Sequence, residues 1–109
     1  MQRLPKQIAC AELGAGTSDL YTAPTNTKTT ISACSVTNKS GAARTVTVTI
    51  KPPGGVARNV AFGLGVAAGE TRVVHGALGQ TIEAGGVLAA FGDAAGALDL
   101  VASAYETNP

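Results

Sequence analysis

The sequence has little of what catalysis, nucleic-acid binding and membrane insertion usually require. Its 109 residues include no tryptophan, one histidine, two cysteines and four aromatic residues, and only 14% are charged. The formal net charge of +1 disfavours nucleic-acid binding, which draws on an excess of cations. No apolar run approaches the roughly 20 residues that span a bilayer, and none follows Arg3 and Lys6 as a signal peptide requires. We therefore expect neither nucleic acid nor membrane as a partner.

The few chemically reactive residues form no recognisable active site. His75 could be combined with Asp99 and Ser103 as a triad, but no nucleophile-elbow motif accompanies them. Residues 63–68 match a loose dinucleotide-binding pattern, yet the residues that follow predict a turn where that motif needs a helix. We therefore expect no catalytic residues, no cofactor and no metal, and a protein that is not an enzyme.

The two cysteines, Cys10 and Cys34, lack the additional Cys or His residues of a zinc site. They could form one disulfide if their strands were adjacent. Nothing in the sequence indicates export to an oxidising compartment. We therefore expect two free thiols, mostly buried.

By contrast, β-strand signals are abundant. Residues 44–50 alternate between threonine on one side and Val46, Val48 and Ile50 on the other, as in a strand with one buried face. The turn residues at 38–41 predict a hairpin that folds this strand back onto residues 29–37, with Gly41 at positive φ. We expect this hairpin to be the nucleus of the fold.

Short strand-like segments, separated by glycine and proline, recur along the rest of the chain. They span residues 8–13, 20–23, 56–66, 71–74, 80–83 and 87–91. Residues 97–105 fit a strand better than a helix. This spacing predicts an all-β fold, a single-domain antiparallel β-sandwich of about eight strands, with jelly-roll and immunoglobulin-like topologies both open. We expect a flexible N-terminal arm over 1–7 and the β-sandwich domain over 8–109.

The cations are unevenly distributed. Six of them lie between residues 28 and 72, where Glu70 is the sole acid: Lys28, Lys39, Arg44, Lys51, Arg58 and Arg72. If the fold gathers them on one side, that side could face an acidic protein surface. The aromatic residues Tyr21, Phe62, Phe91 and Tyr105 have no basic neighbours that would suggest a nucleic-acid platform, so we expect them in the core.

Two segments carry a resemblance to a known group of proteins. The strings LYTAPTNTKTTI at 20–31 and TNKSGAARTVTVTI at 37–50 resemble a pattern in small β-sandwich virion structural proteins of tailed bacteriophages, over roughly residues 19–75. Those proteins are of the capsid decoration (cement) or tail accessory type. The resemblance implies a non-enzymatic virion structural protein, favouring a capsid decoration protein that binds across capsid subunits and stabilises the shell.

Partners and location follow from that resemblance. The expected partners are the major capsid protein or other virion proteins, in a homo-oligomer (dimer or trimer) assembled in the bacterial host cytoplasm and located in the virion. The alternative is a tail, head–tail accessory or receptor-binding module of the virion; a carbohydrate-binding module is less favoured. The candidate contact residues are Arg3, Leu4, Lys6, Pro52, Pro53, Arg58 and Leu64.

Overall fold

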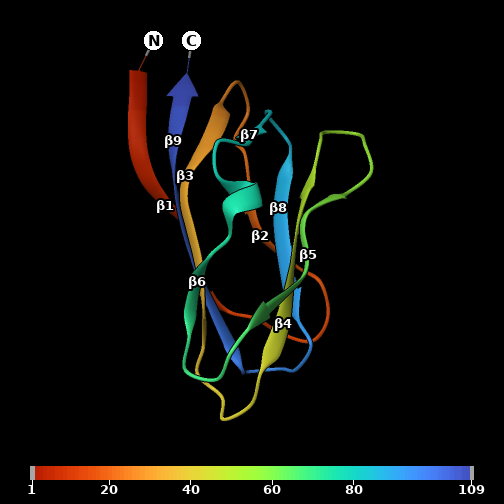
Figure 1. The fold of residues 1–109 in the computed structure, drawn as a ribbon. Coiled ribbons are helices and arrows are strands. Elements are labelled where there is room, and N and C mark those ends of the chain that lie inside the picture. The colour runs from red at the N-terminus through yellow and green to blue at the C-terminus, as the bar shows by residue number, and fades with distance from the viewer. Residues whose placement is uncertain (1, 109) are drawn as a thin grey trace.

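Two antiparallel β-sheets, packed face to face, make up the protein (Figure 1). The structure is a computed structural model that describes residues 2–108, and for residues 2–4, 18 and 108 the backbone alone. Its elements are β1 (Gln2–Glu12), β2 (Ser18–Thr22), β3 (Lys28–Asn38), β4 (Arg44–Lys51), β5 (Arg58–Val66), β6 (Thr71–Val73), the 3-10 turn η1 (His75–Ala77), β7 (Thr81–Ile82), β8 (Val87–Gly92) and β9 (Leu98–Asn108). The expected all-β sandwich is thus confirmed.

The order of the strands identifies the topology. Sheet A runs β1-β9-β3-β6, with β7 also paired to β3, and sheet B runs β2-β8-β4-β5. Among the connections, β4–β5 is a hairpin and β6 and β7 stay within sheet A, whereas the others cross between the sheets. With β6 and β7 counted as one interrupted strand, this arrangement is an eight-stranded jelly roll, the first of the two topologies that the sequence left open.

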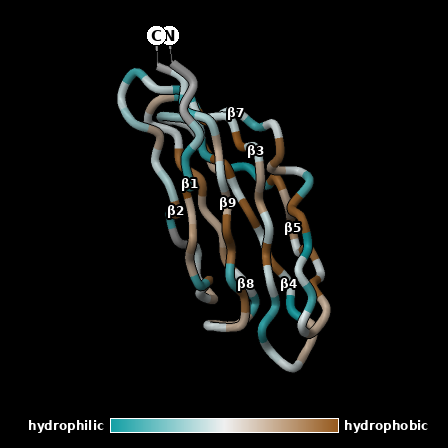
Figure 2. Tube along the Cα trace, turned by 90° about the vertical axis from the view of Figure 1, so that its left-hand side faces the viewer, coloured by the Kyte–Doolittle hydropathy of each residue, from teal (hydrophilic) through white to brown (hydrophobic). Residues whose placement is uncertain are grey.

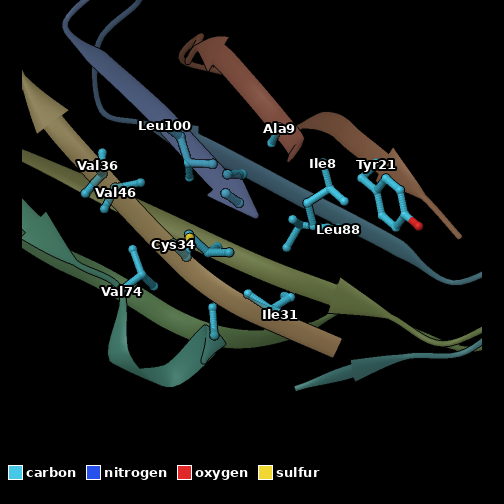
Figure 3. Close-up of a cluster of buried hydrophobic side chains, with 14 of the residues drawn as sticks. Ile8, Ala9, Tyr21, Ile31, Cys34, Val36, Val46, Val74, Leu88 and Leu100 are labelled. Atoms are coloured by element: carbon cyan, nitrogen blue, oxygen red, sulfur yellow. The ribbon is translucent and has the colours of Figure 1, made fainter. Parts of the chain in front are cut away.

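The core lies between the sheets and is built mostly from aliphatic residues (Figure 3). Val46 and Val48 of β4 face it as their alternation predicts, with exposed fractions of 1% and 0%. Val36 and Leu100 reach it from sheet A. Tyr21 is the aromatic residue of this buried cluster, so branched aliphatic packing supplies most of the apolar burial.

The hairpin expected between residues 29–37 and 44–50 is wrong. β3 lies in sheet A and pairs with β9, β6 and β7, whereas β4 lies in sheet B between β8 and β5. The segment at 38–43 is therefore an arch that crosses from one sheet to the other. Gly41 is not among the positive-φ glycines. Instead, the buried side chain of Asn38 holds the arch, because it donates to the carbonyls of Ala42 (2.8 Å) and Val66 (2.9 Å).

The arm expected at residues 1–7 also differs from the structure. From Gln2 onward these residues form the first half of β1 and pair with the end of β9, with a register shift between Gln7 and Ala9. The chain begins as a strand here because β9 extends to Asn108 and offers a partner along its whole length. Figure 2 shows the start of β1 and the end of β9 side by side at one end of the elongated molecule.

The last predicted strand and the glycine-rich string agree with the structure. The segment at 97–105 is strand rather than helix from Leu98 onward, and β3 has a register shift between Ile31 and Ala33. The glycine-rich string at 63–68 lies in β5 and the turn after it, with no helix following. In the described part of the chain, no helix is long and apolar enough to cross a membrane.

Candidate interaction surfaces

Two of the candidate contact residues lie at one end of the sandwich, where three loops meet. We call this the proline end: residues 23–27, 52–57 and 83–86. The backbones of Ala23 and the 85–86 turn exchange two hydrogen bonds of 2.9 Å, and a Cβ on Gly85 would lie 3.4 Å from Pro53. Gly55 donates to the carbonyl of Pro52 at 2.9 Å, and Gly54 has φ 71°, as in a type II turn. Pro52 and Pro53 are thus exposed on a rigid turn.

The remaining candidates are spread over different edges. Lys6 is exposed on β1, at the edge of sheet A, and its Nζ lies 3.3 Å from Glu106. Arg3 and Leu4 precede it in the same strand, and their side chains lie outside the described residues. Arg58 and Leu64 are on β5, at the edge of sheet B; Leu64 is half-buried and packs on the core. The structure therefore does not gather the seven residues into one patch.

A hydrogen-bond network near the proline end was not apparent from the sequence. The hydroxyl of Tyr21 on β2 donates to a carboxylate oxygen of Glu106 on β9 at 2.5 Å and lies 2.7 Å from the hydroxyl of Thr29 on β3. Burial, together with the hydrogen bond to Glu106, raises the pKa of Tyr21 to about 12. Because β2 belongs to sheet B and the other two strands to sheet A, these bonds tie the two sheets together. No motif in the sequence marks this network.

The aromatic residues do not all pack in the core as expected. Phe62 on β5 is 79% exposed. It lies where β5 has a bulge opposite Thr47, whose hydroxyl accepts a hydrogen bond from Gly63 N at 3.2 Å. Phe91 pairs with Thr47 from the other side, so both phenylalanines border this threonine on the outer face of sheet B. The bulge therefore turns the side chain of Phe62 outward, whereas the alternation of the strand would place it inside.

The two thiols are free but unlike one another. Cys34 is buried in the core, where burial raises its pKa to about 11, whereas Cys10 is exposed on β1. Their partners on β9, Val101 and Ala102, are successive residues and so point to opposite faces of sheet A. This explains why the two thiols do not pair, and it corrects the expectation that both are mostly buried.

The residues considered for catalysis are not brought together. His75 lies in η1, beyond β6, whereas Asp99 and Ser103 are on β9, and β3 lies between β6 and β9. Asp99 is engaged with Lys39 at 3.1 Å. Among the residues that the structure describes, no group of three or more His, Cys, Asp or Glu side chains could hold a metal ion.

Comparison with known proteins gives information on the fold. No protein-family model and no curated protein sequence matches the chain. Two solved structures match 98% of it: the T13 particle of infectious bursal disease virus, with a TM-score of 0.62 and 15% identity, and the Gx strain of that virus, with 0.63 and 18%. Both are structures of viruses. The chain spans 31% and 32% of the length of those two chains.

At such low identity the likeness establishes a shared fold alone. The fold described above thus recurs, over nearly the whole of this chain, within a part of those two longer chains. The neighbours belong to an animal virus, and the resemblance to tailed-bacteriophage proteins receives no support from them.

Proposed function

We propose that the protein is a non-enzymatic structural component of a virion, most specifically a capsid decoration (cement) protein of a bacteriophage. The observation that carries this proposal is the jelly roll itself, which matches a part of viral chains along 98% of this chain. Jelly rolls recur in viral capsids, although they also occur in lectins and cupins. The resemblance of residues 20–50 to phage virion proteins favours the narrower assignment.

The proposed mechanism is thermodynamic linkage. A protein that binds the assembled shell but not its separated subunits stabilises the shell by its binding free energy. The proline end suits such contact because a type II turn fixes Pro52 and Pro53, so little conformational entropy is lost on binding. Val56 in the same loop is 67% exposed and would be covered. The proposed partner is the major capsid protein or another virion protein.

The proposal is tested by adding the purified protein to shells that lack it and measuring the temperature at which the shells dissociate. Bound protein should raise that temperature and co-sediment with the shells. Val56→Glu, which adds a charge to the proline end, should weaken both effects. Ala95→Glu adds the same charge to the exposed turn at the opposite end and is the matched control. A protein that neither co-sediments nor stabilises the shells would contradict the decoration role.

The alternative is a tail, head–tail accessory or receptor-binding module built on the same fold. In that role the protein would be present in few copies, at one vertex of the capsid or at the tail. Co-sedimentation with tails, and not with shells, would favour it over decoration.

A further inference from the structure

The cations of the folded protein differ in whether they have a carboxylate partner. Three lysines have carboxylate partners: Lys6 with Glu106, Lys28 with Glu83, and Lys39 with both Glu12 and Asp99. The other cations with described side chains are Arg44, Lys51, Arg58 and Arg72, and none of these has a described carboxylate within salt-bridge distance. All four lie on β4 or on the edge strands β5 and β6, at one side of the sandwich, where Glu70 in the β5–β6 turn adds one carboxylate. We call these four residues the basic edge.

An exposed aromatic ring lies on the outer face of sheet B, beside the basic edge. Phe62 lies at the bulge of β5, and Gly63 takes a φ of 63° there. Arg72 donates to the carbonyl of Gly65 at 2.8 Å, which holds its guanidinium close to β5 on one side of the ring. Arg58, at the start of β5, lies on the other side. Arginine and aromatic residues, phenylalanine included, are enriched at protein–protein interfaces.

The opposite side of the sandwich carries a hollow of complementary character. It has a volume of ≈ 310 Å³ and lies over β1 and β9, lined by Cys10, Ala11, Glu12, Asp99, Leu100 and Val101. Val101 is 40% exposed and supplies an apolar wall, while two carboxylates lie at the rim. These two carboxylates share the single ammonium group of Lys39, so the rim keeps an excess negative charge.

We propose that a second copy of this chain occupies this hollow, with Phe62 of one protomer seated against Cys10 and Val101 of the next. Arg72 then lies toward the rim carboxylates Glu12 and Asp99. The positive charge of the basic edge complements the negative charge at the rim of the hollow. Both surfaces are present on every molecule. The contact joins two different surfaces, so it is heterologous and not a two-fold dimer. Repeated from copy to copy, it builds a ring of three or more copies if the rotation between protomers closes, and an open filament if it does not. This goes beyond the proposed function and is tested without any shell.

Disulfide trapping tests the contact directly, because Cys10 supplies a thiol in the hollow and Cys34 is buried. Under mild oxidation, Phe62→Cys should give disulfide-linked oligomers, and adding Cys10→Ser should abolish them. Val56→Cys is the matched control, an equally accessible position outside the contact. Efficient cross-linking at position 56, or a disulfide dimer of the unmodified protein through Cys10, would overturn the proposal.

Sedimentation of complementary variants tests the head-to-tail arrangement. Phe62→Asp blocks the basic edge and Val101→Asp blocks the hollow, so each variant alone should be monomeric. Mixed together, they should form 1:1 dimers that cannot grow further, because each retains one working surface. The unmodified protein should form oligomers that weaken with salt, since the Debye length falls from about 10 Å at 0.1 M to about 3 Å at 1 M. A monomeric unmodified protein at roughly 100 µM, where a contact with a dissociation constant of about 1 µM is nearly saturated, or a mixture that stays monomeric, would overturn the contact and leave the shell-binding proposal untouched.

Discussion

A single buried amide fixes the arch that carries the chain from sheet A to sheet B. Asn38 is fully buried, and its Oδ1 accepts hydrogen bonds from the backbone N (2.9 Å) and the hydroxyl (2.7 Å) of Ser40. Its amide group donates to two carbonyls, those of Ala42 and Val66. All the hydrogen-bonding groups of this side chain are thus satisfied, which is what permits its burial.

Replacing this amide should destabilise the fold strongly. Asn38→Ala leaves two carbonyls without their donors, so we expect the free energy of unfolding to fall by about 2–4 kcal/mol in chemical denaturation. Asn38→Asp keeps the shape but sets a carboxylate oxygen against the carbonyls of Ala42 and Val66, and it should cost at least as much at neutral pH. An aspartate variant as stable as the unmodified protein would show that the arch does not depend on the amide.

The hydroxyl of Tyr21 makes stability depend on pH at the alkaline end. Its pKa is raised from 10.0 to about 12 in the folded protein, so the folded state retains this proton where the unfolded chain has lost it. The contribution is complete below pH 10 and is lost as pH rises toward 12. We expect a steeper fall of unfolding free energy between these values than in Tyr21→Phe. Identical slopes in the two proteins would contradict this.

The two thiols should react at very different rates. Cys34 is buried, and burial raises its pKa to about 11, so little thiolate forms and little of it is accessible. Under native conditions at high salt, we expect one equivalent of thiol to react readily with a disulfide reagent and the second only on unfolding. Cys10→Ser should remove the fast phase. Fast modification of Cys34 in that variant would contradict the described burial.

At the scale of elements, the sequence predicted which segments are strands better than how they pair. The alternation of residues 44–50 identifies the buried face of β4 correctly, because a period of two depends only on the strand itself. It contains no information on which sheet the strand joins. The turn residues at 38–41 suggested a hairpin, whereas the bonds of Asn38 redirect the chain across the core. In a jelly roll most connections cross between the sheets in this way. The general tendency of consecutive strands to pair with each other therefore does not apply here.

The candidate surfaces were the part least accessible from the sequence. Exposure of Phe62 depends on a bulge opposite Thr47, which is set by the pairing of β4 with β5. The hollow over β1 and β9 joins residues separated by most of the chain. The uneven run of cations between 28 and 72 did point toward the basic edge. However, Lys28 pairs with Glu83 of the proline end and Lys39 with Glu12 of β1, so neither lysine belongs to it.

The packing of η1 on β5 depends on the absence of a side chain. A Cβ on Gly76 would lie 2.0 Å from the carbonyl oxygen of Val60, so Gly76→Ala must push the two elements apart. We expect a loss of about 1–3 kcal/mol in unfolding free energy. Gly41→Ala is the matched control, because nothing lies within 4 Å of its Cβ position, and it should be close to neutral. Equal stability of both variants would contradict the close contact.

At the scale of the whole molecule, the fold provides a rigid body with chemically distinct surfaces. The proline end is exposed and conformationally fixed, while the basic edge and the hollow lie on opposite sides. A ring formed through those two sides would leave the proline ends on one face. We propose that this face meets the shell, so that one assembly contacts several subunits and gains avidity.

The central claim, a structural role in the virion, is tested most directly by the copy number of this protein in purified particles. Quantitative mass spectrometry against the major capsid protein gives that ratio. We expect the protein to be present in a fixed ratio to the major capsid protein, as binding to a symmetric shell requires. A few copies per particle would favour the tail or head–tail alternative. Complete absence from the purified particle would contradict the claim.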